Sequence, residues 1–280
     1  MNAFAGSTWR LAHGRSVELG PRGVLMGILN VTPDSFSDGG RHVDVGTAVV
    51  AAVGMVAAGA TIIDVGGEST RPGAEPVPSD VEIDRVVPVI AALAKRTDAL
   101  ISVDTYRAAT ARAAARAGAH IVNDVTGTLG DDGMIEAVLE EGVGLVLMHN
   151  ARPTFAAPLV GDPVQRLLSF RGDMMNVLER RGVARDRVVF DPGIGFGKET
   201  AENLVLLKRL EELCDGFVPL LLGTSRKRFI GAVTGRENAA ARDVGTAITT
   251  AFGRRAGAAV FRVHDVDSNR DALLMAEALA

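Results

Sequence analysis

Polar side chains that could bind or activate a substrate recur directly after short apolar runs in this 280-residue sequence. The run VLMGIL (24–29) opens onto NVTPDSFSDGG (30–40), which combines an amide, two carboxylates, a phenyl ring and two glycines. The polar residues that follow the other runs are Asp64, Glu68, Asp104, Asn123, Asp124, His149, Asp191, Ser225, Lys227, Arg228, Arg262, His264 and Asp265. Each alone could be a helix cap or a satisfied strand-end group, but together they favour an enzyme site.

Basic side chains gather after the last two of these runs. Lys227 and Arg228 follow LLLGT, while Arg262 and His264 lie in RVHDV near the end of the chain. If the runs are the strands of a barrel, their ends meet at one face, and the loops after the last two strands often bind phosphate. We therefore expect the anionic part of a ligand in this corner.

Acidic and amide side chains at other run ends offer the opposite chemistry. Asp104, Asn123 and Asp191 would present acceptor oxygens deep in the fold. A buried carboxylate is costly unless donors satisfy it, and the paired N–H groups of an amino-pyrimidine edge would do so. The residues by themselves suggest a flat heterocycle held by acidic and amide groups, with an anionic tail held by Lys, Arg and His.

The elements that must position these residues follow one repeated pattern. A helical stretch ends at a glycine (Gly59, Gly118, Gly142, Gly182, Gly257), and a short run rich in Val, Ile and Leu comes next. Glycine there permits the left-handed conformation that stops a helix, and continuous apolar runs are typical of parallel strands covered on both faces. Eight strands are predicted, at residues 24–30, 61–67, 100–105, 120–125, 144–149, 187–192, 218–225 and 259–265.

Eight such β/α units predict a single-domain α/β fold, a closed (β/α)8 TIM barrel over residues 23–280. The doubly wound open sheet is the alternative, because periodicity by itself does not separate the two. Residues 1–22 read as a preface with a possible hairpin that would close the bottom of the barrel.

Composition narrows the class of protein further. A net charge of -4 argues against a nucleic-acid partner, which would favour a basic face. The longest uncharged stretch (45–63) is mostly Ala and Gly and is broken by glycines, so a soluble protein without a membrane span is expected. The single cysteine, Cys214, excludes an internal disulfide framework and fits the cytoplasm. DPGIGFGKE (191–199) fails the spacing of a nucleotide-binding P-loop, and the five histidines lack zinc-site spacing.

Eight spaced motifs, taken in order, resemble one family. They are NVTPDSFSDGG, DVGGESTRPG, SVDT, NDVTG, MH, DPGIGFGK, SRKRFIG and RVHDV, and they span roughly residues 22–280. This order is similar to that of the dihydropteroate synthases, the folate-pathway enzymes blocked by sulfonamides. The resemblance implies a (β/α)8 barrel that condenses hydroxymethyl-dihydropterin diphosphate with para-aminobenzoate and releases diphosphate. One departure is MHNARPTFAAPLV (148–160), where many relatives carry a longer loop containing Gly and Met.

The resemblance also implies roles for individual residues. The pterin pocket would comprise Asp104, Asn123, Asp191 and Lys227. Diphosphate would meet Asn30, Arg262 and His264, with Asn30 as the protein ligand of a Mg²⁺ ion. The residues around para-aminobenzoate would be Phe36, Thr70, Arg71, Pro72 and Phe196. A homodimer is implied as well, as is common in the family.

The same resemblance answers what NVTPDSFSDGG is for. It corresponds to the family's first mobile loop, in which Asp38 would reach Arg71 of the second loop, and both would close over the substrates. Closure would exclude water and strengthen charge interactions at the mouth. The implied catalytic residues are Asp38, Arg71, Lys227, Arg262 and His264, none of them a nucleophile.

Two other functions remain open on the residues alone. A pterin-dependent methyltransferase module shares the barrel and the pterin-binding Asp, Asn and Asp, but it would not need DSFSDGG, STRPG or SRKR. A non-catalytic paralogue would only bind pterin or a partner. Asn30, Arg71, Lys227 and His264 are all in place, which argues against the second reading because loss of function would begin there.

Overall fold

The computed structural model describes residues 6–32, 44–69, 76–152 and 161–280. Within these residues eight parallel strands form one sheet: β3 (Val24–Asn30), β4 (Ile62–Gly66), β5 (Leu100–Asp104), β6 (Ile121–Asp124), β7 (Gly144–Met148), β8 (Val188–Asp191), β9 (Leu221–Leu222) and β10 (Val260–Val263). Their order is β8-β7-β6-β5-β4-β3-β10-β9, and a parallel bridge between Phe190 and Leu220 brings the two ends of this order together. The predicted barrel is confirmed, and the open doubly wound sheet is excluded.

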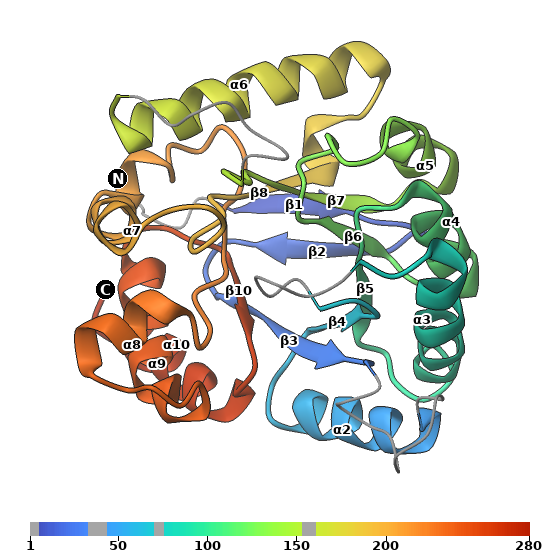
Figure 1. Ribbon diagram of the computed structural model, residues 1–280, viewed down its shortest axis with the longest axis horizontal. Helices are drawn as coiled ribbons and strands as arrows, with labels where there is room; N and C mark the ends of the chain where they lie inside the picture. Colours follow the sequence, from blue (N-terminus) through green and yellow to red (C-terminus); the bar gives the residue numbers. More distant parts are fainter. Residues whose placement is uncertain (1–5, 33–43, 70–75, 153–160) are drawn as a thin grey trace.

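Helices surround this ring of strands (Figure 1). They are α2 (Val45–Ala57), α3 (Ser79–Leu93), α4 (Ala108–Ala117), α5 (Met134–Glu141), α6 (Pro163–Arg181), α7 (Thr200–Lys208), α8 (Arg228–Thr234), α9 (Asp243–Arg255) and α10 (Val266–Ala278). The glycine pattern placed several ends correctly: α4 and α6 stop at Gly118 and Gly182, whose φ angles are 118° and 100°. Only a residue without a side chain adopts such angles readily. None of the helices in the described residues is long and apolar enough to cross a membrane.

The seventh predicted strand is the one that differs most from expectation. Regular pairing covers only Leu221–Leu222, whereas the sequence predicted residues 218–225. The flanking Val218 and Leu220 are nevertheless buried, and the Leu220 carbonyl accepts from the Ala259 N–H. The apolar run therefore predicts which residues are buried better than it predicts how many of them pair in the sheet.

The inside of the barrel is apolar at its lower end. Met26, Ile62, Leu100, Ile121, Val146, Val189, Leu221 and Val260 form a cluster separate from the larger core between strands and helices. These residues occupy neighbouring positions in the strand register, for example Met26 beside Ile62 and Ile62 beside Leu100. Because side chains alternate along a strand, this layer fixes which later residues also point inward.

A hairpin lies against the bottom of the barrel. It consists of β1 (Ser7–Arg10) and β2 (Ser16–Leu19), which pair antiparallel. Trp9 is fully buried in the interior cluster and donates its indole N–H to the Arg187 carbonyl at 2.9 Å. Gly144 leaves room for the hairpin, since a Cβ there would lie 2.5 Å from Leu11 Cδ2 and 3.0 Å from Trp9 Nε1. The interior of the barrel is thus filled with apolar side chains at its lower end.

Candidate active site

Two residues beyond the apolar layer, the inward-facing positions turn polar. Ile62 is followed by Asp64, Ile121 by Asn123, Val189 by Asp191 and Val260 by Arg262. On β5 the change takes two steps, from Leu100 through Ser102 to Asp104. A spacing of two keeps these side chains on the inner face of their strands. The barrel therefore gathers acids, an amide and a guanidinium at its carboxyl end.

Arg262 joins two of these acids across the barrel. Its Nε donates to Asp64 Oδ2 at 2.6 Å, and its other guanidinium nitrogen donates to Asp104 Oδ2, also at 2.6 Å. Asp64 is fully buried and Asp104 is 7% exposed. The second oxygen of each carboxylate, Oδ1, has no hydrogen-bond partner among the described residues. Two buried acceptors are therefore available to donors of a ligand.

Asp64 also determines how Asn123 faces the site. The Asn123 amide nitrogen donates to Asp64 Oδ2 at 3.0 Å, since a carboxylate can only accept from it. The Asn123 amide oxygen is then free to accept a hydrogen bond from a ligand. Sequence reasoning noted Asp64 as a strand-end residue but did not assign it to the site; its position two residues beyond Ile62 was the signal that could have found it.

Asp191 and Lys227 are a second pair of opposite charges at this end of the barrel, and each influences the other electrostatically. Burial raises the pKa of Asp191, and the positive charge of Lys227 opposes the rise. Burial lowers the pKa of Lys227 to about 8, and Asp191 in turn opposes this. Gly223 separates Asp191 from Arg262, since a Cβ on it would lie 3.6 Å from Asp191 Oδ2 and 3.9 Å from Arg262 Cβ. The inward-facing acids are thus balanced by cations that reach in from β10 and the loop after β9.

Phe196 carries two cations over its ring. Lys227 Nζ lies 4.6 Å from the ring centroid and Arg152 Cζ lies 4.9 Å from it. Lys227 Nζ also donates to the Ile194 carbonyl in the same loop. Arg152 comes from the stretch after β7 that departs from the family pattern, and no role was predicted for it. An aromatic face with flanking cations suits an anionic aromatic ligand.

Lys198 is a buried charged residue near the site to which the sequence analysis assigned no role. It is only 8% exposed, and its Nζ donates to the His149 carbonyl at 3.1 Å and to the Gly193 carbonyl at 2.9 Å. Burial lowers its pKa to about 7, with the charge of Asp191 opposing. Its two carbonyl partners identify it as the tie between the loop after β8 and the end of β7. That tie holds the loop carrying Phe196.

His264 and Asn30 lie at the mouth beside this cluster. His264 Nδ1 and Ser225 Oγ are 2.8 Å apart, and the His264 backbone N–H donates to the same oxygen at 3.0 Å. Asn30 pairs in register with Gly66, which pairs in turn with Asp104. A Cβ on Gly66 would lie 3.7 Å from both Asn30 Oδ1 and Asp104 Oδ2. Gly66 thus lets the Asn30 amide and the Asp104 carboxylate approach one another.

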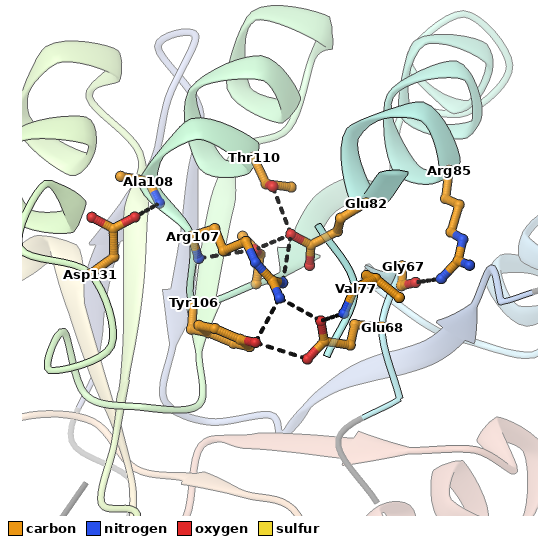
Figure 2. A network of polar contacts seen from close by, with 11 residues as sticks. Gly67, Glu68, Val77, Glu82, Arg85, Tyr106, Arg107, Ala108, Thr110 and Asp131 are labelled. Carbon is orange, nitrogen blue, oxygen red and sulfur yellow. Dashed lines mark hydrogen bonds and ion pairs between the residues drawn. The ribbon is translucent and has the colours of Figure 1, made fainter. Parts of the chain in front are cut away.

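Not every strand-end residue reaches this cluster: Glu68 bonds Tyr106 and Arg107 outside it (Figure 2), and Asp124 and His149 turn away from it. Asp124 is fully buried and accepts from Thr126 and Thr128 of its own loop. His149 stacks edge-on against Phe170 at 4.9 Å, and burial lowers its pKa to about 3. Both follow an inward-facing residue by one position, so alternation turns them away.

Five of the predicted site residues lie outside the described residues. They are Phe36, Asp38, Thr70, Arg71 and Pro72. Their predicted roles stay predictions. The described members, Asn30, Asp104, Asn123, Asp191, Phe196, Lys227, Arg262 and His264, all come from the carboxyl ends of the strands or the loops that follow them.

The donor set at Asn30 fits a hard cation only if a ligand contributes most of the oxygens. In the described residues no group of three or more His, Cys, Asp or Glu side chains could hold a metal. Asn30 offers one amide oxygen, with the Asp104 carboxylate close by across Gly66. Mg²⁺ commonly keeps several waters and binds one or two protein oxygens together with substrate phosphates. The residues present therefore fit a magnesium ion that arrives with a diphosphate.

Comparisons with known proteins identify the family. Residues 26–264 match the family described as pterin binding enzyme. Dihydropteroate synthase of Escherichia coli (strain K12) is 42% identical over 270 residues, which cover 95% of each chain. The Xanthomonas albilineans dihydropteroate synthase solved with 4-aminobenzoic acid is 43% identical, with a TM-score of 0.90 and 98% of both chains covered. The Clostridium difficile enzyme, solved in the presence of pteroic acid, is 43% identical with a TM-score of 0.89, covering 93% of this chain and 98% of the other.

The barrel and its ring of inward-facing acceptors thus define a pterin-binding enzyme of the (β/α)8 class. The identity and coverage of its relatives narrow the class further. The chain belongs to the dihydropteroate synthase family.

Proposed function

We propose that this chain is a transferase that condenses hydroxymethyl-dihydropterin diphosphate with para-aminobenzoate, giving dihydropteroate and diphosphate. The observation that carries the proposal is the group of buried acceptors facing cations inside one barrel mouth: Asp64, Asp104, Asn123 and Asp191 opposite Lys227 and Arg262. Membership of the dihydropteroate synthase family supports the same reaction.

The pterin ring would lie on the acceptor side of this mouth. Asp104 Oδ1 and the Asn123 amide oxygen would take its N–H groups, and Asp191 would take the amino-pyrimidine edge. The orientation of Asn123 depends on Asp64, which holds its amide nitrogen. Lys227 Nζ, directed by the Ile194 carbonyl and the charge of Asp191, would donate to an acceptor on the ring. Donors of the ring would then satisfy the carboxylate oxygens that lack a protein partner.

The diphosphate would lie toward His264 and Ser225, after the last two strands of the barrel. Ser225 Oγ lies 2.8 Å from His264 Nδ1 and would orient the imidazole for this role. Asn30 would be the protein residue that holds Mg²⁺. The ion, when bound, disperses the negative charge that grows on the leaving diphosphate.

The reaction needs no protein nucleophile. The bond between the exocyclic carbon and the diphosphate oxygen breaks, and the leaving group keeps the electron pair. The amine nitrogen of para-aminobenzoate then forms the new C–N bond and loses a proton to water or to the departing phosphate. Phe196, with Arg152 and Lys227 over its ring, would form one wall for the aminobenzoate. Asp38 and Arg71, predicted from the sequence alone, would complete the other side.

A coupled assay for diphosphate release tests this function directly. Release that requires both the pterin diphosphate and para-aminobenzoate supports it. Release without para-aminobenzoate, or pterin binding with no release at all, would contradict it and favour the methyltransferase or the non-catalytic alternative.

Asn30→Ala should weaken Mg²⁺-dependent binding of the pterin diphosphate in calorimetry, while the affinity for free pterin should change little. An equal loss of affinity for both ligands would contradict the assignment of Asn30 as the metal ligand.

We further propose a cytoplasmic homodimer formed through the face of α9 and α10. Val244, Ile248 and Phe252 follow one another at intervals of four on α9 and are 74%, 53% and 73% exposed. Leu274 and Met275 on the neighbouring α10 are also exposed. An apolar face of this kind marks an association site. Phe252→Asp should halve the mass measured by sedimentation, whereas a wild type that sediments as a monomer would refute the dimer.

A further inference from the structure

Three glycines of DPGIGFGK (191–198) share a backbone conformation that other residues rarely adopt. Gly193, Gly195 and Gly197 have φ angles of 64°, 80° and 70°. Only a residue without a side chain adopts such angles readily. The glycines fail the spacing of a phosphate loop, so the reason for their alternation must lie in the residues that surround them.

Two of the three glycines bring the loop against the backbone that follows β7. A Cβ on Gly193 would overlap the His149 carbonyl oxygen, and a Cβ on Gly197 would lie 2.6 Å from the Ala151 carbonyl oxygen. The Ala151 N–H also donates to the Phe196 carbonyl at 3.1 Å. No side chain has room at either glycine, so the backbone of the loop lies directly on the end of β7.

The third glycine faces Lys227. A Cβ on Gly195 would lie 3.0 Å from Lys227 Cδ. The residues on either side of this glycine contact the amine at the other end of the side chain. The Ile194 carbonyl accepts from Lys227 Nζ, and the centroid of the Phe196 ring lies 4.6 Å from it. Lysine has a flexible four-carbon stem, so contacts along its whole length select one direction for the amine.

Lys198 fixes the loop on the side of β7. Its Nζ donates to the Gly193 carbonyl at 2.9 Å, inside the loop, and to the His149 carbonyl at 3.1 Å, after β7. The side chain is only 8% exposed, so both carbonyls would lose a donor in a place with little water if Lys198 were replaced. One ammonium group therefore sets the distance between the loop and the neighbouring strand.

Asn203, on α7, fixes the opposite side of the loop and is 2% exposed. Its Oδ1 accepts from the Gly195 N–H at 2.8 Å, and its Nδ2 donates to the carbonyls of Lys198 and Glu199, both at 3.0 Å. The bond to Gly195 holds the very residue that lies against the stem of Lys227. Among the described residues, neither Lys198 nor Asn203 has a hydrogen bond to Lys227 itself, so both can act on it only through the loop or through charge.

We propose that Lys198 and Asn203 are positioning residues that hold the loop 193–197 around Lys227, and that they set the affinity for pterin through the direction of the Lys227 amine. This inference rests on the proposed function, in which that amine donates to the pterin ring. A donor that is already oriented loses less conformational freedom when the ligand binds. The alternating glycines are then explained as the shape that lets a loop lie on one strand and surround a lysine at the same time.

The small number of lysines makes the position of Lys227 observable. The sequence contains only four of them, Lys95, Lys198, Lys208 and Lys227. Labelling lysine at Cε should therefore give NMR signals that can be assigned one by one and titrated. Burial lowers the pKa of Lys227 to about 8. Asn203→Ala should release the loop at Gly195 and admit water to the amine, so the pKa of Lys227 should rise toward the ordinary value of about 10.4. An unchanged pKa in the folded variant would overturn the positioning role.

Binding of free pterin tests the consequence for affinity. Asn203→Ala should lower the calorimetric affinity by ~10-fold, because the Lys227 amine is no longer held in one direction. Asn269→Ala is the matched control: this asparagine of α10 is fully buried, donates to the Asp265 carbonyl at 2.7 Å and accepts from the Thr250 hydroxyl at 2.6 Å. The control should lose stability while keeping the wild-type affinity and the wild-type pKa of Lys227. Equal losses of affinity in the two variants would overturn the proposal.

Lys198→Met tests the loop from the side of β7. It should also lower the affinity for free pterin by ~10-fold, whereas Lys208→Met, which removes an exposed lysine of α7, should not change it. Lys198 also acts by its charge on Asp191, so a loss in Lys198→Met without a loss in Asn203→Ala would assign the effect to that charge and overturn the positioning role. If the wild type releases no diphosphate with both substrates, the proposed function fails, yet the lysine titration and the pterin affinity still test the loop.

Discussion

Arg262 and Arg107 perform the same electrostatic task in two different places. Each bridges two carboxylates from separate elements: Arg262 joins Asp64 and Asp104 inside the barrel, and Arg107 joins Glu68 and Glu82 behind it. All four carboxylates are at least nine-tenths buried. The partners of the carboxylates differ, however, and so do the strand faces from which they project.

Around Arg107, most of the carboxylate oxygens of Glu68 and Glu82 accept hydrogen bonds from the protein itself. Both oxygens of Glu68 have partners, and one oxygen of Glu82 receives three donors. Glu82 Oε1 does lack a partner among the described residues, so a lone unpaired oxygen does not distinguish the clusters. Around Arg262, by contrast, each carboxylate keeps one unpaired oxygen, and both carboxylates belong to inward-facing positions of their strands. An ion pair whose acceptors mostly bond to the protein supports the fold. An ion pair at inward-facing positions, with one unpaired oxygen on each carboxylate, can instead accept hydrogen bonds from a ligand.

Arg262→Met should give the largest effect. It leaves Asp64 and Asp104 uncompensated, which is expected to cost about 3–5 kcal/mol of unfolding free energy. It should also lower kcat/KM by ~100-fold or more, since a preorganised cation in a dry site is lost. Denaturant unfolding and the diphosphate assay measure the two effects.

A second substitution separates the two roles of Arg262. Adding Asp64→Asn to Arg262→Met removes one of the two uncompensated charges and should recover stability without recovering turnover. Recovered turnover would mean that the pair is structural, as we infer for Arg107, and the contrast between the clusters would fail.

Arg107→Met should destabilise the protein by a similar mechanism but with a different functional outcome. The loss of unfolding free energy is expected to be ~2–4 kcal/mol, because Glu82 stays buried without its counter-charge. Folded enzyme should still bind pterin diphosphate with nearly wild-type affinity in calorimetry. A large loss of that affinity would show that the two clusters are coupled rather than separate.

Asp104→Asn should show how much free energy of unfolding is lost by keeping a charged carboxylate beside Asp64 and Arg262. Burial raises the pKa of Asp104 to about 7, against the charge of Arg262, so the folded carboxyl holds its proton at a pH where the unfolded one has lost it. The stabilisation from this group is complete below pH ~4 and is lost as the pH rises through ~7. The variant should therefore gain stability relative to wild type, on the order of 2 kcal/mol, between pH 4 and 8, while losing activity. A difference in Tm that is constant with pH would contradict this.

His120→Asn should have the smallest effect and lies far from either arginine. Burial, aided by the charges of His13 and Arg15, lowers the pKa of His120 to about 4, and its Nδ1 accepts from the Ile101 N–H at 3.0 Å. The stability tied to the neutral ring is complete above pH ~6.5 and is lost as the pH falls toward 4. Asparagine keeps the acceptor but does not titrate, so the fall in Tm over that window should shrink by an amount equivalent to ~1–2 kcal/mol. Enzyme activity at neutral pH should not change, since this residue belongs to the lower end of the barrel.

Much of the fold could be predicted because the signals are local. Glycines after helical stretches and runs of Val, Ile and Leu placed all eight strands, and seven of them agree with the prediction to within about two residues at each end. The strand before Ser225 was overestimated, because apolar residues continue beyond the paired segment. The motif series also identified the described pterin and diphosphate candidates, each of which lies at the carboxyl end of the barrel.

The sequence predicted where the polar residues lie on the strands, but it did not predict which of them bond to one another. Arg262 was expected beside His264 at the diphosphate; in the structure it bonds Asp64 and Asp104, while His264 bonds Ser225. The burial of Lys198 and the place of Arg152 over Phe196 were likewise invisible. These contacts join residues tens to nearly two hundred positions apart, and no local pattern encodes such distances.

The sequence by itself determined the succession of β/α units, the stops of several helices and the chemical types available at each strand end, since these depend on neighbouring residues and on period. The tertiary structure decided which of those types meet. Closure of the sheet turned Asp64, Asp104, Asn123, Asp191 and Arg262 toward one another and turned Asp124, His149 and Thr105 away. Arg262 therefore lies among carboxylates with an unpaired oxygen each, and Arg107 lies among carboxylates that mostly bond to the protein. The physical reason is that a strand alternates its faces, so a shift of one residue moves a side chain from the barrel interior to the helix layer.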